Sequence, residues 1–262
     1  MNFKSISQSK KDTGLSYLGM VNNSTKHEKA FKYDELVYTL YLAPAKSSGY
    51  EVCPMRTEFC TKLCLNESGR NKMDTKKNTI NNSRIKKTKL FFEEREFFVR
   101  WMIEEIKRSK LKSEKLGYSF SVRLNNTSDI SPEMFWIRQD DGSTKNILQL
   151  FPDVTFYDYT KILGRKIKEI PNYSLTFSAA DGNDADVAKA IVQGYNIATV
   201  FGIKKTLPMP ETYLGLPVFN GDESDLRFLD PKGVVVGLYA KGKAKKDTTG
   251  FVKYPVLMLK AA

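Results

Sequence analysis

Residues 154–201 read VTFYDYTKILGRKIKEIPNYSLTFSAADGNDADVAKAIVQGYNIATVF, and the alternation within this stretch decides the fold class. Three short segments are rich in β-branched and aromatic residues, which is typical of strands. They are residues 154–159, 173–178 and 196–201. The segments between them, residues 161–170 and 185–193, are predicted to be helical, and Gly194 ends the second. Strands separated by helices pair in parallel through crossover connections, so the sequence predicts an α/β fold.

Further apolar runs extend this pattern in both directions. They lie at residues 36–42, 118–124, 216–220 and 233–239, each predicted to be a strand. Residues 74–112 carry a long helical pattern, broken once, and Gly117 follows its end. Residues 132–150 are predicted to form a helix that is interrupted by a turn at residues 140–143. Because residues 1–33 are polar and poorly patterned, we expect a lead-in followed by one domain, residues 34–262.

Polar side chains follow several predicted strands at the point where each strand ends. Two arrangements fit such a chain, an open doubly wound sheet or a partial or complete (β/α) barrel with a cysteine-bearing loop after its first strand. In a barrel the C-terminal strand ends converge on one mouth, which favours the barrel. The alternative is that these residues cap helices and make turns. The candidate cofactor- or substrate-binding residues are Arg123, Asn125, Asp129, Asp158, Lys161, Ser178, Asn183, Asp222, Arg227 and Lys241.

The composition is that of a folded and strongly basic protein. The chain is 41% hydrophobic and 12% aromatic, which excludes a disordered protein. Its apolar runs are shorter than the roughly 20 residues that a membrane helix needs. Its first residues lack a secretory signal, so we expect a cytoplasmic protein without membrane contact. The formal net charge of +12 indicates a partner such as nucleic acid or a nucleotide, and a basic solvated surface is the alternative.

The three cysteines of the chain, Cys53, Cys60 and Cys64, have the spacing C-x6-C-x3-C in the loop after the first predicted strand. A cytoplasmic compartment keeps thiols reduced, so disulfides are not expected. Thiolates are soft ligands for zinc and for iron–sulfur iron, and three of them close together can surround one centre. A cubane [4Fe–4S] cluster can use three cysteines and leave its fourth iron open to a small molecule. We therefore predict an iron–sulfur site at these residues.

Two alternatives to the cluster remain open. A structural zinc ion needs four ligands, and His27, the single histidine of the chain, could complete a Cys3His site. The three cysteines could instead be unrelated core residues, since free cysteine is often buried. The polar residues around them argue against that, because Arg56, Glu58 and Lys62 do not suit a core strand.

A basic segment follows the cysteine loop. Positive charge at the start of the predicted helix opposes its macrodipole, and a phosphate partner would offset this. A solvated helix face is the alternative. The candidate nucleic-acid contacts are Arg70, Lys76, Lys77, Arg84 and Lys87.

The chain resembles the phage family of gene product eighty-eight over nearly everything after the lead-in. The matching segments include LAPA at 42–45, the cysteine loop at 53–65, Gly69-Arg70, Arg84, Lys87-Thr88, LFF at 90–92, VRLN at 122–125, TSDI at 127–130, FYDYTK at 156–161 and residues 230–241. This resemblance implies no mechanism.

The expected architecture also looks like that of radical S-adenosylmethionine enzymes, where a partial α/β barrel carries three cysteines after its first strand. That resemblance implies a [4Fe–4S] cluster and S-adenosylmethionine, with Asn125 and Asp129 near the amino-acid head group. The chain departs from the pattern twice. Its cysteine spacing is not C-x3-C-x2-C, and residues 125–129 replace the Gly-Gly-Glu type of segment.

Two functions follow as expectations. The first is an iron–sulfur enzyme with a radical-S-adenosylmethionine-like site that acts on a nucleotide or nucleic-acid-related substrate, with its catalytic residues unknown. The second is a non-catalytic nucleic-acid-binding or host-interaction protein with a structural zinc or cluster site.

Overall fold

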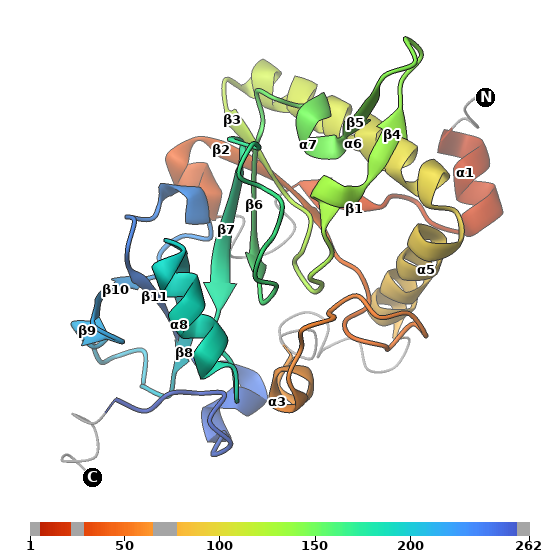
Figure 1. Cartoon of the computed structure of the whole chain (residues 1–262). Coiled ribbons are helices and arrows are strands. Elements are labelled where there is room, and N and C mark those ends of the chain that lie inside the picture. The colour runs from red at the N-terminus through yellow and green to blue at the C-terminus, as the bar shows by residue number, and fades with distance from the viewer. Residues whose placement is uncertain (1–5, 22–28, 65–77, 256–262) are drawn as a thin grey trace.

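The structure is a computed structural model that describes residues 6–21, 29–64 and 78–255 (Figure 1). The helices are α1 Ile6–Thr13, α3 Glu58–Lys62, α5 Thr79–Glu93, α6 Arg95–Leu116, α7 Ile147–Leu150 and α8 Asp184–Val192, with short 3-10 turns η1 Lys29–Tyr33, η3 Pro132–Met134, η4 Arg227–Leu229 and η5 Gly242–Lys246. The strands are β1 Gly19–Val21, β2 Glu35–Leu40, β3 Ser119–Arg123, β4 Trp136–Arg138, β5 Thr144–Asn146, β6 Thr155–Thr160, β7 Tyr173–Ser178, β8 Asn196–Phe201, β9 Thr212–Tyr213, β10 Leu216–Asn220 and β11 Val235–Tyr239.

One nine-stranded sheet organises the described residues, in the order β1-β2-β3-β6-β7-β8-β11-β10-β9. Every neighbouring pair from β2 to β10 is parallel, while β1 and β9 pair antiparallel at the two edges. The α/β prediction is therefore confirmed. Parallel neighbours place all their C-terminal ends along one edge of the sheet, so the residues that follow these strands share that edge.

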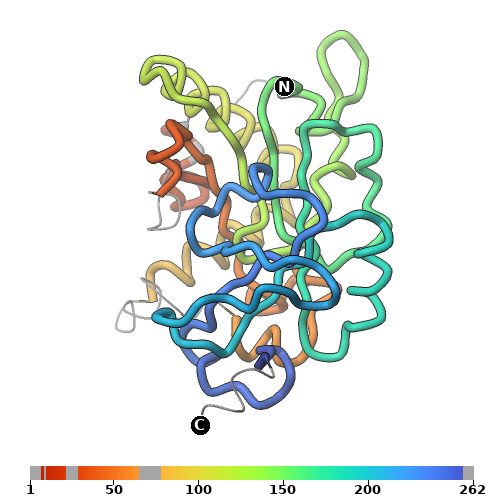
Figure 2. Tube along the Cα trace, turned by 90° about the vertical axis from the view of Figure 1, so that its left-hand side faces the viewer, coloured from red at the N-terminus to blue at the C-terminus, as the bar shows by residue number. Residues whose placement is uncertain are grey.

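A barrel is not confirmed, because no closed sheet occurs among the described residues. The strands from β2 to β8 follow one another in chain order, as in a barrel, but the direction then reverses: β11 lies next to β8 and β10 lies beyond it. The antiparallel strands β1 and β9 end the sheet on either side. In Figure 2, which looks at the β9 side, the C-terminal third of the chain lies nearest the viewer and the N-terminal elements lie behind it.

Both faces of the sheet are buried, which is why its strands are apolar without a strict alternation of apolar and polar residues. On one face α6 packs against β2 and β3, and α8 packs against β7 and β8. Tyr38 and Phe156 belong to the large core on the α6 side. Their sequence neighbours Val37 and Tyr157 point to the other face and form a smaller cluster with Leu226. The period of two along each strand thus supplies both layers.

The helix predictions hold in part. The long helical pattern forms α5 and α6, broken at Glu94, and Gly117 ends α6 with a φ of 69°. Residues 185–193 correspond to α8. The helix predicted at 132–150 is wrong, because residues 136–146 form the hairpin β4–β5. The turn at residues 140–143 connects two short extended segments, which is the pattern of a hairpin and not of an interrupted helix. The helix predicted at 161–170 is absent, and turns occupy that stretch.

The described part of the predicted lead-in packs onto the sheet. Leu15 and Leu18 are core residues, and β1 pairs with β2. Glu105 of α6, itself buried, accepts hydrogen bonds from the backbone N–H of Leu18 and of Gly19 at 2.9 Å each. No helix within the described ranges is long and apolar enough to cross a membrane.

Candidate functional site

A cavity of about 1400 Å³ lies at the C-terminal edge of the parallel strands. Its lining includes Arg123, Thr160 and Ser178, which are the last residues of β3, β6 and β7. It also includes Tyr41, the residue that follows β2. Ligands of open α/β sheets bind at this edge. The topology thus brings residues that are far apart in the sequence to one site.

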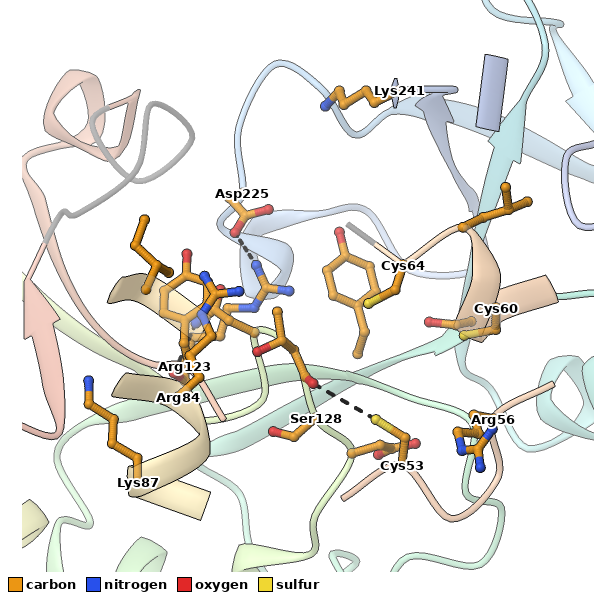
Figure 3. Close-up of a pocket in the computed structure, with 18 of the residues that line it drawn as sticks. Cys53, Arg56, Cys60, Cys64, Arg84, Lys87, Arg123, Ser128, Asp225 and Lys241 are labelled. Atoms are coloured by element: carbon orange, nitrogen blue, oxygen red, sulfur yellow. Dashed lines mark hydrogen bonds and ion pairs between the residues drawn. The ribbon is translucent and has the colours of Figure 1, made fainter. Parts of the chain in front are cut away.

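All three cysteines line this cavity. Cys53 precedes α3, Cys60 lies within it and Cys64 follows it, and each is partly exposed. Figure 3 shows their side chains on the same side of the cavity. The Cys53 thiol donates to the carbonyl oxygen of Thr127 at 3.8 Å. All three thiols thus border one cavity, and the prediction that they hold one metal centre stays a prediction.

The cysteine segment is held by side chains on either side of it. Glu51 accepts from the Cys53 N–H at 2.8 Å and from Arg56 Nε at 3.0 Å. Thr57 caps α3 by accepting from the Cys60 N–H at 3.2 Å. Asp181, in the loop after β7, accepts from the Thr57 hydroxyl and from the Phe59 N–H. These contacts position a five-residue helix that is too short to be stable alone.

Burial, with smaller contributions from the nearby Cys64, Asp129 and Cys60, raises the pKa of the Cys53 thiol to about 12. The thiol is therefore protonated at neutral pH, whereas the metal-binding form of cysteine is the thiolate. Within the ranges that the structure describes, no three or more His, Cys, Asp or Glu side chains are grouped closely enough to hold a single metal ion.

Cationic side chains form the facing side of the cavity. Figure 3 shows Arg84, Lys87 and Arg123 on the side away from Cys60. Arg84 lies over the ring of Tyr41 at 4.8 Å, and Lys87 lies over the ring of Tyr17 at 4.5 Å. Burial lowers the pKa of Lys87 to about 8, with the attraction of Glu105 opposing this and the charge of Arg84 adding to it.

Arg123 forms a buried ion pair with Asp225, which lies just before η4. The guanidinium group also lies over the ring of Tyr159 at 4.9 Å. The Tyr159 hydroxyl and Arg123 Nε are buried polar atoms for which the described residues supply no hydrogen-bond partner. Both residues line the cavity, although these two atoms are themselves covered by protein.

The predicted site residues that the structure describes divide into two groups. Those that line the cavity are Cys53, Cys60, Cys64, Arg84, Lys87, Arg123, Asp129, Lys161, Ser178 and Lys241. The cavity lining does not include Asn125, Asp158, Asn183, Asp222 and Arg227. Arg70, Lys76 and Lys77, together with His27, lie outside the described residues.

The residues away from the cavity organise its loops. Asn125 accepts from the Ile130 N–H at 2.9 Å, and Asp158 accepts from the Asn125 N–H at 2.7 Å. Asn183 accepts from the Ala180 N–H at 2.8 Å, which closes the turn after β7. Arg227 pairs with Asp230 at 3.2 Å. For these residues the alternative of turn and cap formation describes the contacts better than ligand binding.

Several lining residues were not among the predicted site residues. Asp225 belongs to the same polar run as Asp222, and Arg56 lies three residues after Cys53, so sequence signals for both existed. Tyr159 is adjacent to Asp158 in a predicted strand, and its face of the sheet could be read only from the fold. Tyr17 lies in the polar lead-in, where no pattern marked it.

The family model described as Gene product 88 matches residues 7–255. Neither the comparison with curated proteins nor the comparison with solved structures gave a significant match. The matched range includes α1 except Ile6, the whole sheet and every cavity-lining residue described above. The chain therefore belongs to the Gene product 88 family.

Proposed function

We propose that this protein is an iron–sulfur enzyme whose cavity holds a [4Fe–4S] cluster on Cys53, Cys60 and Cys64 and an anionic, nucleotide-related substrate beside it. The observation that carries the proposal is that three thiols and several cationic side chains line one cavity of about 1400 Å³. A volume of this size accommodates a cofactor and a small substrate together.

The chemistry of the three side chains supports a three-thiolate centre, although their described positions do not bring them close enough to hold one metal ion. All three ligands are soft, and they come from one short segment that Glu51, Thr57 and Asp181 hold against the sheet. A bound iron ion would replace the proton that burial keeps on Cys53. When bound, a cluster with one open iron supplies a coordination site and a one-electron redox couple. Arg123, held by Asp225, and Tyr159 line the same cavity and would border a polar ligand next to it.

The likeness to radical S-adenosylmethionine enzymes is part of the proposal. Its support is that the cysteine segment follows β2, the first parallel strand, and that β2, β3, β6, β7 and β8 adjoin in chain order. This order suits a partial barrel. Asn125, which the likeness assigns to the S-adenosylmethionine head group, instead binds the backbone of its own loop, whereas Asp129 lines the cavity.

Anaerobic purification followed by iron, sulfide and zinc analysis and a visible spectrum tests the cluster. We expect iron and sulfide in equal amounts and a spectrum that bleaches on reduction. Cys60→Ala should lose the iron, while the control Thr61→Ser, which keeps the hydroxyl that Arg56 contacts, should retain it. A colourless wild-type protein that carries zinc, or full iron content in Cys60→Ala, would contradict the proposal.

Cofactor use is tested on the reduced protein. Added S-adenosylmethionine should change the electron paramagnetic resonance spectrum of the cluster and be cleaved. If the protein carries a cluster but shows neither effect, the proposal of a cluster stands and S-adenosylmethionine is excluded as its cofactor.

The net charge of +12 favours a second candidate, a nucleic-acid-binding protein in which a zinc or cluster site only stabilises the cysteine segment. This candidate predicts binding without turnover. It also predicts that metal removal lowers the melting temperature and weakens nucleic-acid binding together.

A further inference from the structure

Lys87 is buried at the wall of the cavity, with 5% of its surface exposed. Its neighbours include the Tyr17 ring at 4.5 Å and the charges of Glu105 and Arg84. Glu105 already accepts from the Leu18 and Gly19 N–H groups and from the Tyr38 hydroxyl at 2.7 Å. Within the described residues Lys87 has no hydrogen-bond acceptor. A buried ammonium group without an acceptor costs stability, and an anion in the cavity would supply one.

Arg84 reinforces this positive charge. It lies one helical turn before Lys87, so both side chains leave the same face of α5, and both line the cavity. Tyr41 and Tyr17 hold the two cations through their ring faces at 4.8 and 4.5 Å. A ring face orients a cation without neutralising it, so neither tyrosine cancels the positive potential of this wall.

Neutral donors and the start of the helix extend the same wall. Asn82 and Ser83 line the cavity together with Thr79, the first residue of α5. The first turn of this fifteen-residue helix contains no acidic residue. The helix macrodipole therefore adds positive potential at this end of the wall.

We propose that the α5 wall, defined by Arg84 and Lys87 with Tyr17 and Tyr41, binds the phosphate group of a phosphorylated small molecule. The proposal refines the proposed function by naming the group that anchors the substrate. Two neighbouring cations match the charge of a phosphate dianion better than that of a carboxylate. An arginine fork beside a lysine point charge is also a common phosphate site. The burial of Lys87 excludes contact with a polynucleotide backbone that lies on the outer surface.

The test uses metal-free protein at constant ionic strength and titrates inorganic phosphate, with acetate as the carboxylate probe. Phosphate should bind to wild type and raise its melting temperature, whereas acetate should bind at least tenfold more weakly. Arg84→Met and Lys87→Met should each weaken phosphate binding at least tenfold. Lys89→Met, which removes an exposed lysine from the same helix, should bind like wild type. Melting curves of the variants without phosphate verify that each one folds.

Three results would overturn the proposal: no phosphate binding by wild type, equal binding of acetate, or equal loss of affinity in Lys89→Met. A duplex DNA probe adds a fourth, since loss of DNA binding with unchanged phosphate binding in Lys87→Met would assign this wall to nucleic acid. Cys60→Ala should bind phosphate like wild type. The phosphate site and the cluster can therefore fail independently.

Discussion

A buried ionisable side chain reduces stability in one of its protonation states, and Lys87 illustrates this at the cavity wall. Burial lowers its folded-state pKa from 10.5 to about 8, with Glu105 and Arg84 as the charged neighbours and Tyr17 against the ammonium group. The folded protein thus binds this proton less tightly than the unfolded chain. The cost, on the order of 3 kcal/mol, is complete below pH 8 and is relieved as the pH rises towards 10.5.

We therefore expect Lys87→Met to raise the melting temperature at pH 7 by roughly 5 °C in phosphate-free buffer. The gain should shrink as the pH approaches 10, because wild-type Lys87 then becomes neutral. Thermal unfolding at several pH values measures both effects, and Lys89→Met serves as the exposed control. An unchanged or lower melting temperature for Lys87→Met at pH 7 would show that the ammonium group is paired within the protein.

The pKa of Asp158 is shifted upward, so its titration changes the stability in the opposite direction with pH. Burial raises the pKa of this carboxyl group to about 7, although Arg123, the Asn125 N–H and Tyr173 stabilise the carboxylate. The folded protein binds this proton more tightly than the unfolded chain does. Stability should therefore fall as the pH rises from about 4 to 7 and then level off.

Asp158→Asn should flatten this dependence, since the amide does not titrate. The variant should also lose about 1–2 kcal/mol at pH 5, because one acceptor of the Asn125 and Tyr173 hydrogen bonds is replaced. Urea unfolding at pH 5, 6, 7 and 8 measures both, with the exposed Asp140→Asn as control. A profile as steep as that of wild type would assign the pH dependence to other groups.

At the scale of elements, α3 depends on its neighbours. Thr57 caps it, and Asp181 connects it to the loop after β7. We expect Asp181→Ala to destabilise the protein by about 1–2 kcal/mol and to speed hydrogen exchange in residues 57–64. Iron content should fall with it, since Cys60 and Cys64 lie on this segment. The control Asp184→Ala changes an exposed acid of α8. Unchanged exchange in Asp181→Ala would mean that α3 is held by its packing alone.

Local pattern predicts some elements of this fold and misses others. Residues 173–178 and 196–201 were predicted as strands and are β7 and β8, because β-branched and aromatic residues suit a buried parallel sheet. Residues 136–138 have a buried residue between two exposed ones, which is a strand pattern. Three residues are too few for this pattern to be recognised within a sequence that has a helical period on both sides. The β6–β7 connection ends at Asn172, whose side-chain amide donates to the carbonyl oxygens of Leu148, Phe151 and Val154 in the segment before β6.

At the scale of the whole molecule, the net charge of +12 governs encounters with polyanions. We expect non-specific binding of duplex DNA to weaken at least tenfold between 50 and 200 mM salt, because counterions are released from each phosphate that the protein contacts. Fluorescence anisotropy at several salt concentrations measures this. Lys87→Met should give the same salt slope as wild type, since its side chain is buried. DNA binding that does not weaken with salt would show that the binding is not electrostatic.

The sequence by itself determined the α/β class and most strands of the sheet, because these depend on residue types and on spacing over a few positions. Only the tertiary structure decided that the sheet is open among the described residues, since strand order depends on pairings between distant segments. It also separated Arg123 and Lys241, which line the cavity, from Asn125 and Asp158, which hold loops. It further showed that Lys87, a predicted nucleic-acid contact with a solvated helix face as the alternative, is buried in the wall of the cavity. The physical reason is that burial and side-chain direction are set by what packs against a residue, and for Lys87 that includes Tyr17, seventy positions away in the chain.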